Sequence, residues 1–318
     1  MLMPFVGLNA QKQTIKTDST IIGISLQEAY DNAWNNYQIG YYKKALEQIK
    51  PFYDRGDAPS DVYQLLGNIY DAMGMHNKAN TIYDEGLLRF PKAGNLFLEK
   101  GNVQFADGKY PQALYWYEKG IENDPTFASN YYCASKVFFL STEKVWGVMY
   151  GELFMLLEQE SDRCKAFSKQ LYDVYAECFQ ISGGKAIADF DNKIIVYSDS
   201  FERPNRFPEV FDSLMSKVAA NKRYISIENL IQIRKQFVSR LSLSNSDMNN
   251  VLFNYWQKLI SMGYFEAYNY WLFAYGNNAE ATRWINNNKQ KWNSFRAWFQ
   301  KNPISLSEKN YFSRYLME

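Results

Sequence analysis

A turn signature recurs at a fixed interval in the first half of this sequence. A Gly-x-Tyr-x-x-Ala motif at 108–113 repeats a Gly-x-His-x-x-Ala motif at 74–79, which in turn repeats a Gly-x-Tyr-x-x-Ala motif at 40–45. Glycine and alanine at a constant period of 34 residues are typical of helical-repeat arrays, in which each repeat is a pair of helices. One such pair cannot bury its own apolar stripe, so successive pairs stack. The sequence therefore predicts a mainly all-α fold.

Four repeats can be aligned in this frame, at 26–59, 60–93, 94–127 and 128–161. The second repeat carries the full pattern of aromatic, small and turn positions, which are Tyr63, Gly67, Gly74, His76, Ala79, Tyr83, Gly86 and Pro91. The third repeat carries it equally well, with Phe97, Gly101, Gly108, Tyr110, Ala113, Tyr117, Gly120 and Pro125. The first and fourth repeats diverge, because Phe52 replaces a small residue in the first and Thr142 replaces the turn glycine in the fourth.

This pattern resembles the tetratricopeptide repeat, and the likeness extends to exported proteins of that family in Bacteroidetes-type bacteria. Its small positions keep two helix axes close where they cross, and its turn glycine tolerates a positive φ. The resemblance implies a helix-turn-helix solenoid over 26–161 and a concave groove lined by the first helix of each pair. In that family the groove binds peptides or proteins.

The resemblance also selects candidate partner-binding residues, at the groove positions of the four first helices. These are Tyr30, Trp34, Tyr37, Gln64, Asn68, Asp71, Leu98, Asn102, Phe105, Tyr132 and Lys136. Some family members hold a terminal carboxylate with a basic clamp, but here Lys136 is the one basic residue among the groove positions. An amide and aromatic surface suits an extended peptide, since amides pair with backbone groups and aromatic rings supply contact area. In the alternative interpretation, the N-terminal segment or the C-terminal helices cover these aromatic residues.

The first 25 residues precede the repeats and form a separate region in this interpretation. Residues 1–10 are apolar and end in Leu-Asn-Ala before Gln11, which resembles the end of a secretory signal peptide, and 11–25 is a polar linker. This pattern predicts export to the periplasm or envelope. The alternatives are an apolar tail that packs on the first helix and a cytoplasmic protein.

The second half of the chain is expected to continue in helices. A capping and linking region spans 162–245 and an aromatic-rich region spans 246–318. A small β-hairpin near 185–198, turning at Asp191-Asn192, competes with an irregular helix there. The expected helices are 162–180, 208–220, 226–241, one beginning after a Ser246-Asp247 cap, and 278–288, 291–301 and 306–316.

Composition argues against several function classes. Lysine plus arginine (35) nearly equals aspartate plus glutamate (34), so there is no basic excess for nucleic acid. A single histidine and three cysteines without a C-x-x-C pair argue against a metal site and a histidine-based triad. No apolar run is long enough for an integral membrane span. We therefore expect no catalytic residues and no cofactor.

Together these patterns predict a protein-protein interaction scaffold that binds a peptide or protein partner in the repeat groove, as an accessory component of an envelope complex. The sequence leaves the oligomeric state open. The alternative hypothesis is an enzyme or a small-ligand-binding protein whose site lies in 181–318, with the repeats used for recruitment. A polar pocket with convergent carboxylates in 181–318 would favour the alternative, whereas a close-packed aromatic core would argue against it.

Overall fold

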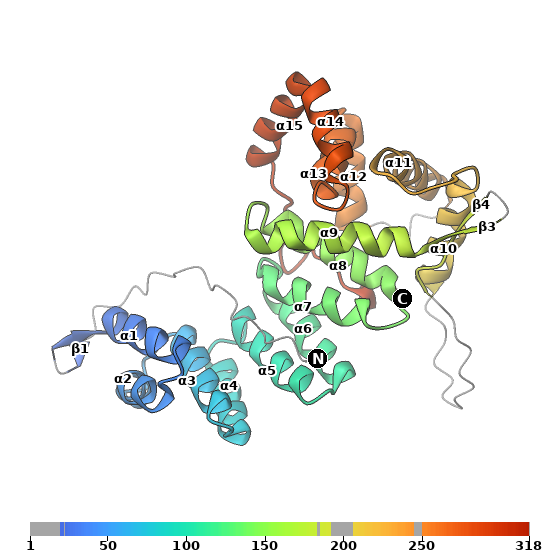
Figure 1. Ribbon diagram of the computed structural model, residues 1–318. Helices are drawn as coiled ribbons and strands as arrows, with labels where there is room; N and C mark the ends of the chain where they lie inside the picture. The colour runs from blue at the N-terminus through green and yellow to red at the C-terminus, as the bar shows by residue number, and fades with distance from the viewer. Residues whose placement is uncertain (1–19, 22, 183–184, 192–205, 245–249, 318) are drawn as a thin grey trace, which may run out of the picture. The chain divides into compact units, whose positions relative to one another are not determined.

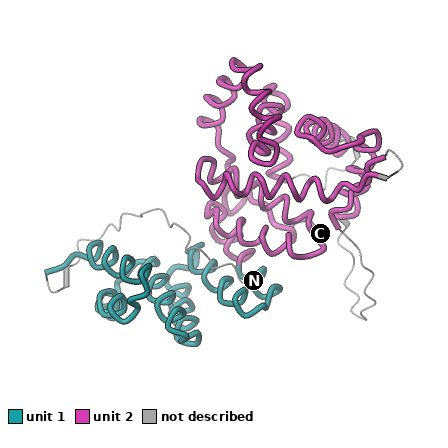
Figure 2. Tube along the Cα trace, in the orientation of Figure 1, with its two compact units in different colours: residues 1–116 teal, residues 117–318 magenta. Residues whose placement is uncertain are grey.

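Helices follow one another along nearly the whole described chain. The computed structural model describes residues 20–21, 23–182, 185–191, 206–244 and 250–317. Within these ranges it contains fifteen α-helices and two small antiparallel strand pairs (Figure 1). The expectation of a mainly all-α helical-repeat fold is confirmed. The chain divides into two compact units, residues 1–116 and 117–318, which are coloured separately in Figure 2.

Unit 1 consists of consecutive helix pairs. A short strand pair, β1 (Thr20–Ile21) with β2 (Ile24–Ser25), precedes the first helix. The helices are α1 (Leu26–Gln38), α2 (Tyr42–Asp54), α3 (Ser60–Ala72), α4 (His76–Arg89), α5 (Gly94–Ala106) and α6 (Tyr110–Asn123), the last of which crosses the boundary between the units. These bounds follow the 34-residue frame. The turn glycines Gly40, Gly74 and Gly108 adopt φ of +82°, +74° and +73°, the conformation that glycine tolerates best.

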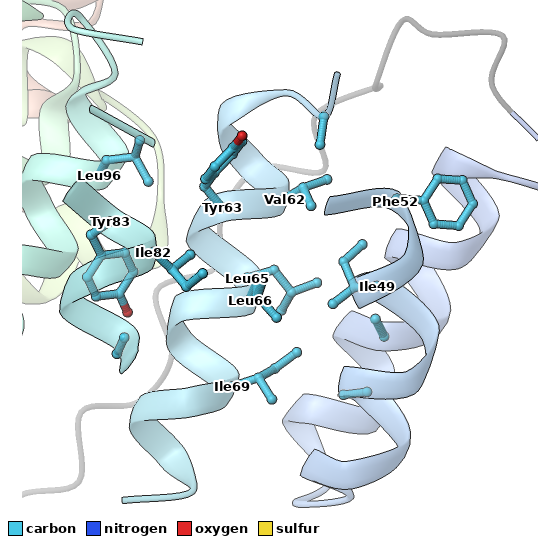
Figure 3. Close-up of a cluster of buried hydrophobic side chains, with 14 of the residues drawn as sticks. Ile49, Phe52, Val62, Tyr63, Leu65, Leu66, Ile69, Ile82, Tyr83 and Leu96 are labelled. Carbon is cyan, nitrogen blue, oxygen red and sulfur yellow. The ribbon is translucent and has the colours of Figure 1, made fainter. Parts of the chain in front are cut away.

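The apolar residues of α1 to α5 form the core of unit 1, with α2, α3 and α4 at its centre. Figure 3 shows Ile49 from α2 facing Leu66 and Ile69 from α3, with Ile82 and Tyr83 from α4 on the other side. Ile49, Leu66 and Ile69 are fully buried. Each helix therefore buries its apolar stripe against both neighbours, as stacked pairs must.

Gly67 on α3 shows how closely the two helices of a pair approach. A β-carbon added there would lie 2.1 Å from Cε1 of Tyr83, which is far inside van der Waals contact. The Tyr83 ring is 1% exposed, and its hydroxyl donates a hydrogen bond of 2.5 Å to Oδ1 of Asn68. Because the ring is held at both ends, it cannot move aside. The small residue expected here is thus required by the tyrosine of the second helix.

We expect Gly67→Ala to lower the free energy of unfolding by about 2 kcal/mol through overpacking, although alanine is the better helix former. Urea unfolding followed by circular dichroism measures this change. Leucine at position 83 has a smaller side chain that leaves room for the methyl group. In the Tyr83→Leu background, Gly67→Ala should therefore lower the free energy of unfolding by much less. Equal costs in the two backgrounds would show that Tyr83 does not impose the glycine.

Unit 2 continues the helical succession with a short hairpin inserted. Its elements after α6 are α7 (Ala128–Phe139), α8 (Lys144–Leu157), α9 (Asp162–Glu177), β3 (Phe179–Ser182), β4 (Lys185–Ala188), α10 (Arg206–Ala219), α11 (Ile227–Ser244), α12 (Val251–Ser261), α13 (Phe265–Leu272), α14 (Asn278–Asn287), α15 (Lys289–Lys301) and the 3₁₀ turn η2 (Arg314–Leu316). Helix α9 lies between the α7–α8 pair and the C-terminal helices (Figure 1), and Ser168 Oγ donates to the Leu272 carbonyl at 2.7 Å. Ser161 caps the N-terminus of α9, since its Oγ accepts from the Cys164 amide at 3.0 Å.

The hairpin occurs earlier in the chain than expected. Strands β3 and β4 pair with Phe179 opposite Ala188 and Ser182 opposite Lys185, so they flank Gly183-Gly184 rather than Asp191-Asn192. A pair of glycines is a favoured connection in two-residue hairpins, a signal in the sequence that the expected hairpin did not include. The irregular helix that competed with the hairpin is wrong for 185–188. The expected second strand, at 193–198, lies outside the described residues.

Two further expectations near the C-terminus need correction. Residues 306–316 do not form a helix, because Ser307 and Asn310 close a tight turn and only 314–316 make a 3₁₀ turn. Long-range contacts of Phe312 with α8 and of Arg314 with α6 override the local helical pattern. Helix α12 is capped by Asn250, whose Oδ1 accepts from two amides at 3.0 Å, while the expected Ser246-Asp247 cap lies outside the described residues.

Candidate functional site

The first helices α3 and α5 of unit 1 share a set of polar side-chain contacts, and the aromatic residues of the first helix α1 lie beside them. We call the surface formed by α1, α3 and α5 the first-helix face. Asn95 Nδ2 on α5 donates to Asp61 Oδ1 at 3.2 Å and to Gln64 Oε1 at 2.9 Å, both on α3. Asn95 and Asp61 are one repeat period apart. The 34-residue period of the sequence therefore reappears as a ladder of side-chain contacts between neighbouring first helices.

Glu99 on α5 is the centre of this ladder. Its carboxylate accepts hydrogen bonds from the amides of Gln64 at 2.6 Å, Asn68 at 3.2 Å and Asn102 at 2.8 Å. The residue is 9% exposed, and its burial raises the pKa of the carboxyl group, while the three amide hydrogen bonds favour the charged form. Three of the predicted groove residues thus converge on a buried acid that the sequence interpretation did not select.

The hydroxyl of Tyr83 fixes the orientation of this network. It donates to Asn68 Oδ1, so the Asn68 nitrogen faces Glu99. Because Tyr83 is also the ring that packs over Gly67, the position of the amides depends on the close crossing of α3 and α4. The polar surface is therefore held by the packing beneath it.

The predicted aromatic residues of α1 lie beside the same acids. Tyr30, Trp34 and Tyr37 are half-buried and pack against the unit 1 core, and the rings of Trp34 and Tyr37 are 5.8 Å apart. Burial raises the pKa of Tyr37 to about 12, and the charge of Glu99 adds to this effect. Burial also raises the pKa of Tyr30, with Asp61 as the next contributor. Both hydroxyl groups are thus within electrostatic range of the α3 and α5 carboxylates.

The charge of the first-helix face is negative. It carries Asp31, Asp61, Asp71 and Glu99, and within the described ranges neither a lysine nor an arginine forms an ion pair with any of the four. Asp71 accepts from His76 at 2.7 Å, a hydrogen bond that raises the pKa of this exposed imidazole.

Lys100, the residue after Glu99, belongs to a different surface. Its ammonium pairs with Asp84 and lies 4.1 Å from the ring centre of Trp116. Consecutive residues on a helix point in different directions. The Lys100 ammonium is therefore directed away from Glu99 and does not balance the charge of its carboxylate.

The other predicted groove residues, Leu98, Phe105, Tyr132 and Lys136, lie outside the side-chain hydrogen-bond network of Glu99 in the described part of the chain. Leu98 is 1% exposed, and Phe105 is half-buried with its ring 5.3 Å from that of Tyr110. In unit 2, the Tyr132 ring lies 5.0 Å from the guanidinium of Arg163, and Lys136 Nζ donates to Gln170 at 2.8 Å. Lys136 and Gln170 are also 34 residues apart. Helix α9 thus follows α7 as the next first helix and engages both side chains.

A second polar cluster lies inside unit 2. Arg234 Nη2 contacts both carboxylate oxygens of Glu152 at 2.6 Å, and Glu152 also accepts from Trp256 Nε1 at 2.6 Å and from the Tyr268 hydroxyl at 2.5 Å. Arg234 also donates to Asn269. All five residues are 0% exposed. Without solvent access, this cluster is a polar centre of the core. One signal could have found it, since Glu152 is the single acid in the apolar stretch 145–157.

The remaining reactive groups show no arrangement for chemistry in the described part of the chain. The three cysteines are free and buried, and burial raises the pKa of Cys164 and Cys178 to about 12. No group of three or more histidine, cysteine or acidic residues is positioned to hold a metal ion within the described residues. Among those same residues, no helix combines the length and apolarity needed to cross a lipid bilayer.

Neither a protein-family model nor a curated protein matches this sequence. The candidate site therefore rests on its own geometry, which is a half-buried polar and aromatic surface on α1, α3 and α5 with an acid at its centre.

Proposed function

We propose that this protein is an interaction scaffold that binds an extended peptide, or an extended segment of a protein partner, along the first-helix face of unit 1. The observation that carries the proposal is the amide ladder formed by Gln64, Asn68, Asn95 and Asn102 around Glu99. The resemblance to tetratricopeptide repeats supports it, since in that family the first helices carry the partner-binding residues.

The physical reason is preorganisation. The amides are already oriented by hydrogen bonds, so binding does not need to order them, and less conformational entropy is lost. Amide groups can also exchange hydrogen bonds with a peptide backbone while Tyr30 and Trp34 supply rigid contact area. Binding of this kind requires no covalent step.

The test uses the full chain and an array of synthetic peptides of varied sequence. We expect the protein to bind a subset of these peptides and the double variant Asn68→Arg/Asn102→Arg to lose them, because two long cationic side chains would occupy the face. The new guanidinium groups can pair with Glu99, whereas Asn68→Arg also removes the acceptor of the buried Tyr83 hydroxyl. We therefore expect a lower melting temperature but a cooperative melt, and circular dichroism checks that the variant remains helical.

A matched control separates this effect from a general effect of added charge. Asn77→Arg/Gln112→Arg places the same two substitutions at exposed positions on the second helices α4 and α6 and should retain binding. Retained binding by the Asn68/Asn102 variant would exclude the first-helix face as the binding surface. Equal loss of binding in both variants would also contradict the proposal, because added charge alone would then explain it.

The alternative of a site in 181–318 receives no support from the described residues there. Most aromatic side chains of 251–299 pack into or against a core, in which Trp256, Phe295 and Phe299 are 0% exposed. We further propose, from residues 1–10 alone, that the scaffold is exported to the periplasm or envelope and serves a complex there. This part of the proposal is independent of the first-helix face.

A further inference from the structure

The first-helix face has a charge that its own residues do not balance. Glu99 is nine-tenths buried, and each hydrogen bond that it accepts comes from a neutral amide. Asp61 accepts from the Asn95 amide, and Asp31 accepts from the Gln27 amide at 3.1 Å. Amides satisfy the oxygen atoms of a carboxylate but leave its charge in place. A charged group in a partly buried site has a higher free energy than in water, and its Coulomb attraction to an opposite charge is also stronger there. A cation that reaches these carboxylates is therefore bound more tightly than it would be by carboxylates in open solvent.

The surroundings of these acids also favour a cation. Tyr30, Trp34 and Tyr37 present half-buried aromatic rings on the neighbouring helix, and their π-faces attract ammonium and guanidinium groups. The protein already uses this contact at Lys100 over Trp116 and at Arg163 over Tyr132. In contrast, an acidic peptide would place its carboxylates beside Glu99 and Asp61, which like-charge repulsion disfavours.

We infer that the occupant of the first-helix face is a cationic peptide segment, whose lysine or arginine side chains lie against Glu99 and Asp61 and beside the aromatic rings of α1. This inference rests on the proposed function and specifies the chemistry of its partner. Charge complementarity is the argument, since the face offers carboxylates, amide acceptors and aromatic rings together. The backbone of the segment would pair with the amides between the charged contacts.

The probe is a fluorescein-labelled peptide that alternates lysine with serine and is blocked at both ends. About nine residues suffice, because an extended chain spans about 3.3 Å per residue and packed helices lie about 9 Å apart. Two matched peptides carry acetyl-lysine or glutamate in place of lysine. Fluorescence anisotropy with the full chain at fixed ionic strength gives the three dissociation constants. We expect the lysine peptide to bind at least about tenfold more tightly than either of the others.

Substitutions of the carboxylates test whether the lysine peptide binds at the first-helix face. Asp61→Asn/Glu99→Gln should raise the dissociation constant of the lysine peptide by about tenfold or more. Asp61→Asn alone, which leaves the hydrogen bonds of Glu99 intact, should raise it by about threefold. The control Glu47→Gln/Asp57→Asn removes two exposed carboxylates outside the face and should leave affinity unchanged. Equal weakening by the control would show a general charge effect and overturn the inference.

The remaining outcomes distinguish the inference from the function on which it rests. If all three peptides bind equally and Asn68→Arg/Asn102→Arg abolishes all of them, the preference for a cation is wrong while the binding face is correct. Tighter binding of the glutamate peptide would also overturn the inference alone. If no peptide in this set or in the varied array binds, both the inference and the proposed function fail.

Discussion

Replacing Arg234 with methionine is expected to lower the free energy of unfolding of unit 2 by about 3–5 kcal/mol. The substitution leaves the Glu152 carboxylate in the core without its cation, and both residues are 0% exposed. Trp256 Nε1 and the Tyr268 hydroxyl still donate to Glu152, but neither carries a charge. The guanidinium also lies 4.2 Å from the ring centre of Trp256, so methionine loses this contact as well.

Urea unfolding followed by tryptophan fluorescence measures the change. The control Lys235→Met alters the exposed neighbour of Arg234 on α11 and should stay within about 0.5 kcal/mol of the wild type. In the double variant Glu152→Leu/Arg234→Met no charge is left buried, so its cost should be clearly less than the sum of the two single costs. Additive costs, or a cost for Arg234→Met no larger than that of Lys235→Met, would contradict the importance of this pair.

Phe312→Ala is expected to lower the free energy of unfolding by about 3–4 kcal/mol, the cost of removing a buried aromatic side chain. Phe312 is 1% exposed, and its ring packs edge-on to Tyr150 with a centroid distance of 5.4 Å. Next to it, Arg314 Nε donates to Glu118 at 2.8 Å, and the Arg314 amide donates to the Tyr150 hydroxyl at 3.1 Å. The cavity would therefore loosen the attachment of the whole segment after α15.

Differential scanning calorimetry of the full chain gives this value. Leu316→Ala is the matched control, because Leu316 lies in the same segment and is 57% exposed. It should change the free energy of unfolding by less than about 0.5 kcal/mol. Similar melting temperatures for Phe312→Ala and the wild type would mean that residues 302–317 contribute little to the stability of unit 2.

The helix-pair frame was predictable because each of its signals is local. Gly74 marks a turn that needs a positive φ, and Gly67 marks a helix crossing that excludes a β-carbon. Each glycine and the structural feature that requires it lie within the same 34-residue repeat. The same period placed Gln64, Asn68 and Asn102 on one surface. It missed Glu99, which lies one residue beyond a predicted position, and it selected Leu98, which is buried.

The interior of unit 2 could not be predicted in the same way. Glu152 and Arg234 are 82 residues apart, and no periodicity links them. The expected helix at 306–316 failed for a related reason, since Phe312 and Arg314 satisfy partners on α8 and α6 rather than within their own turn. Side-chain pairing across such separations depends on the tertiary fold, which local propensity does not encode.

The two units also differ in when they can fold during synthesis. The polar contacts described in unit 1 join residues no more than 35 positions apart, so each helix pair can dock as soon as it has left the ribosome. In contrast, the hydrogen bonds of Tyr150 and Glu118 to Arg314 cannot form until Arg314 has been synthesised, which is 164 and 196 positions further along the chain. Until it arrives, the apolar surface of α8 is incompletely covered. Unit 1 can therefore be complete while unit 2 still depends on protection from aggregation.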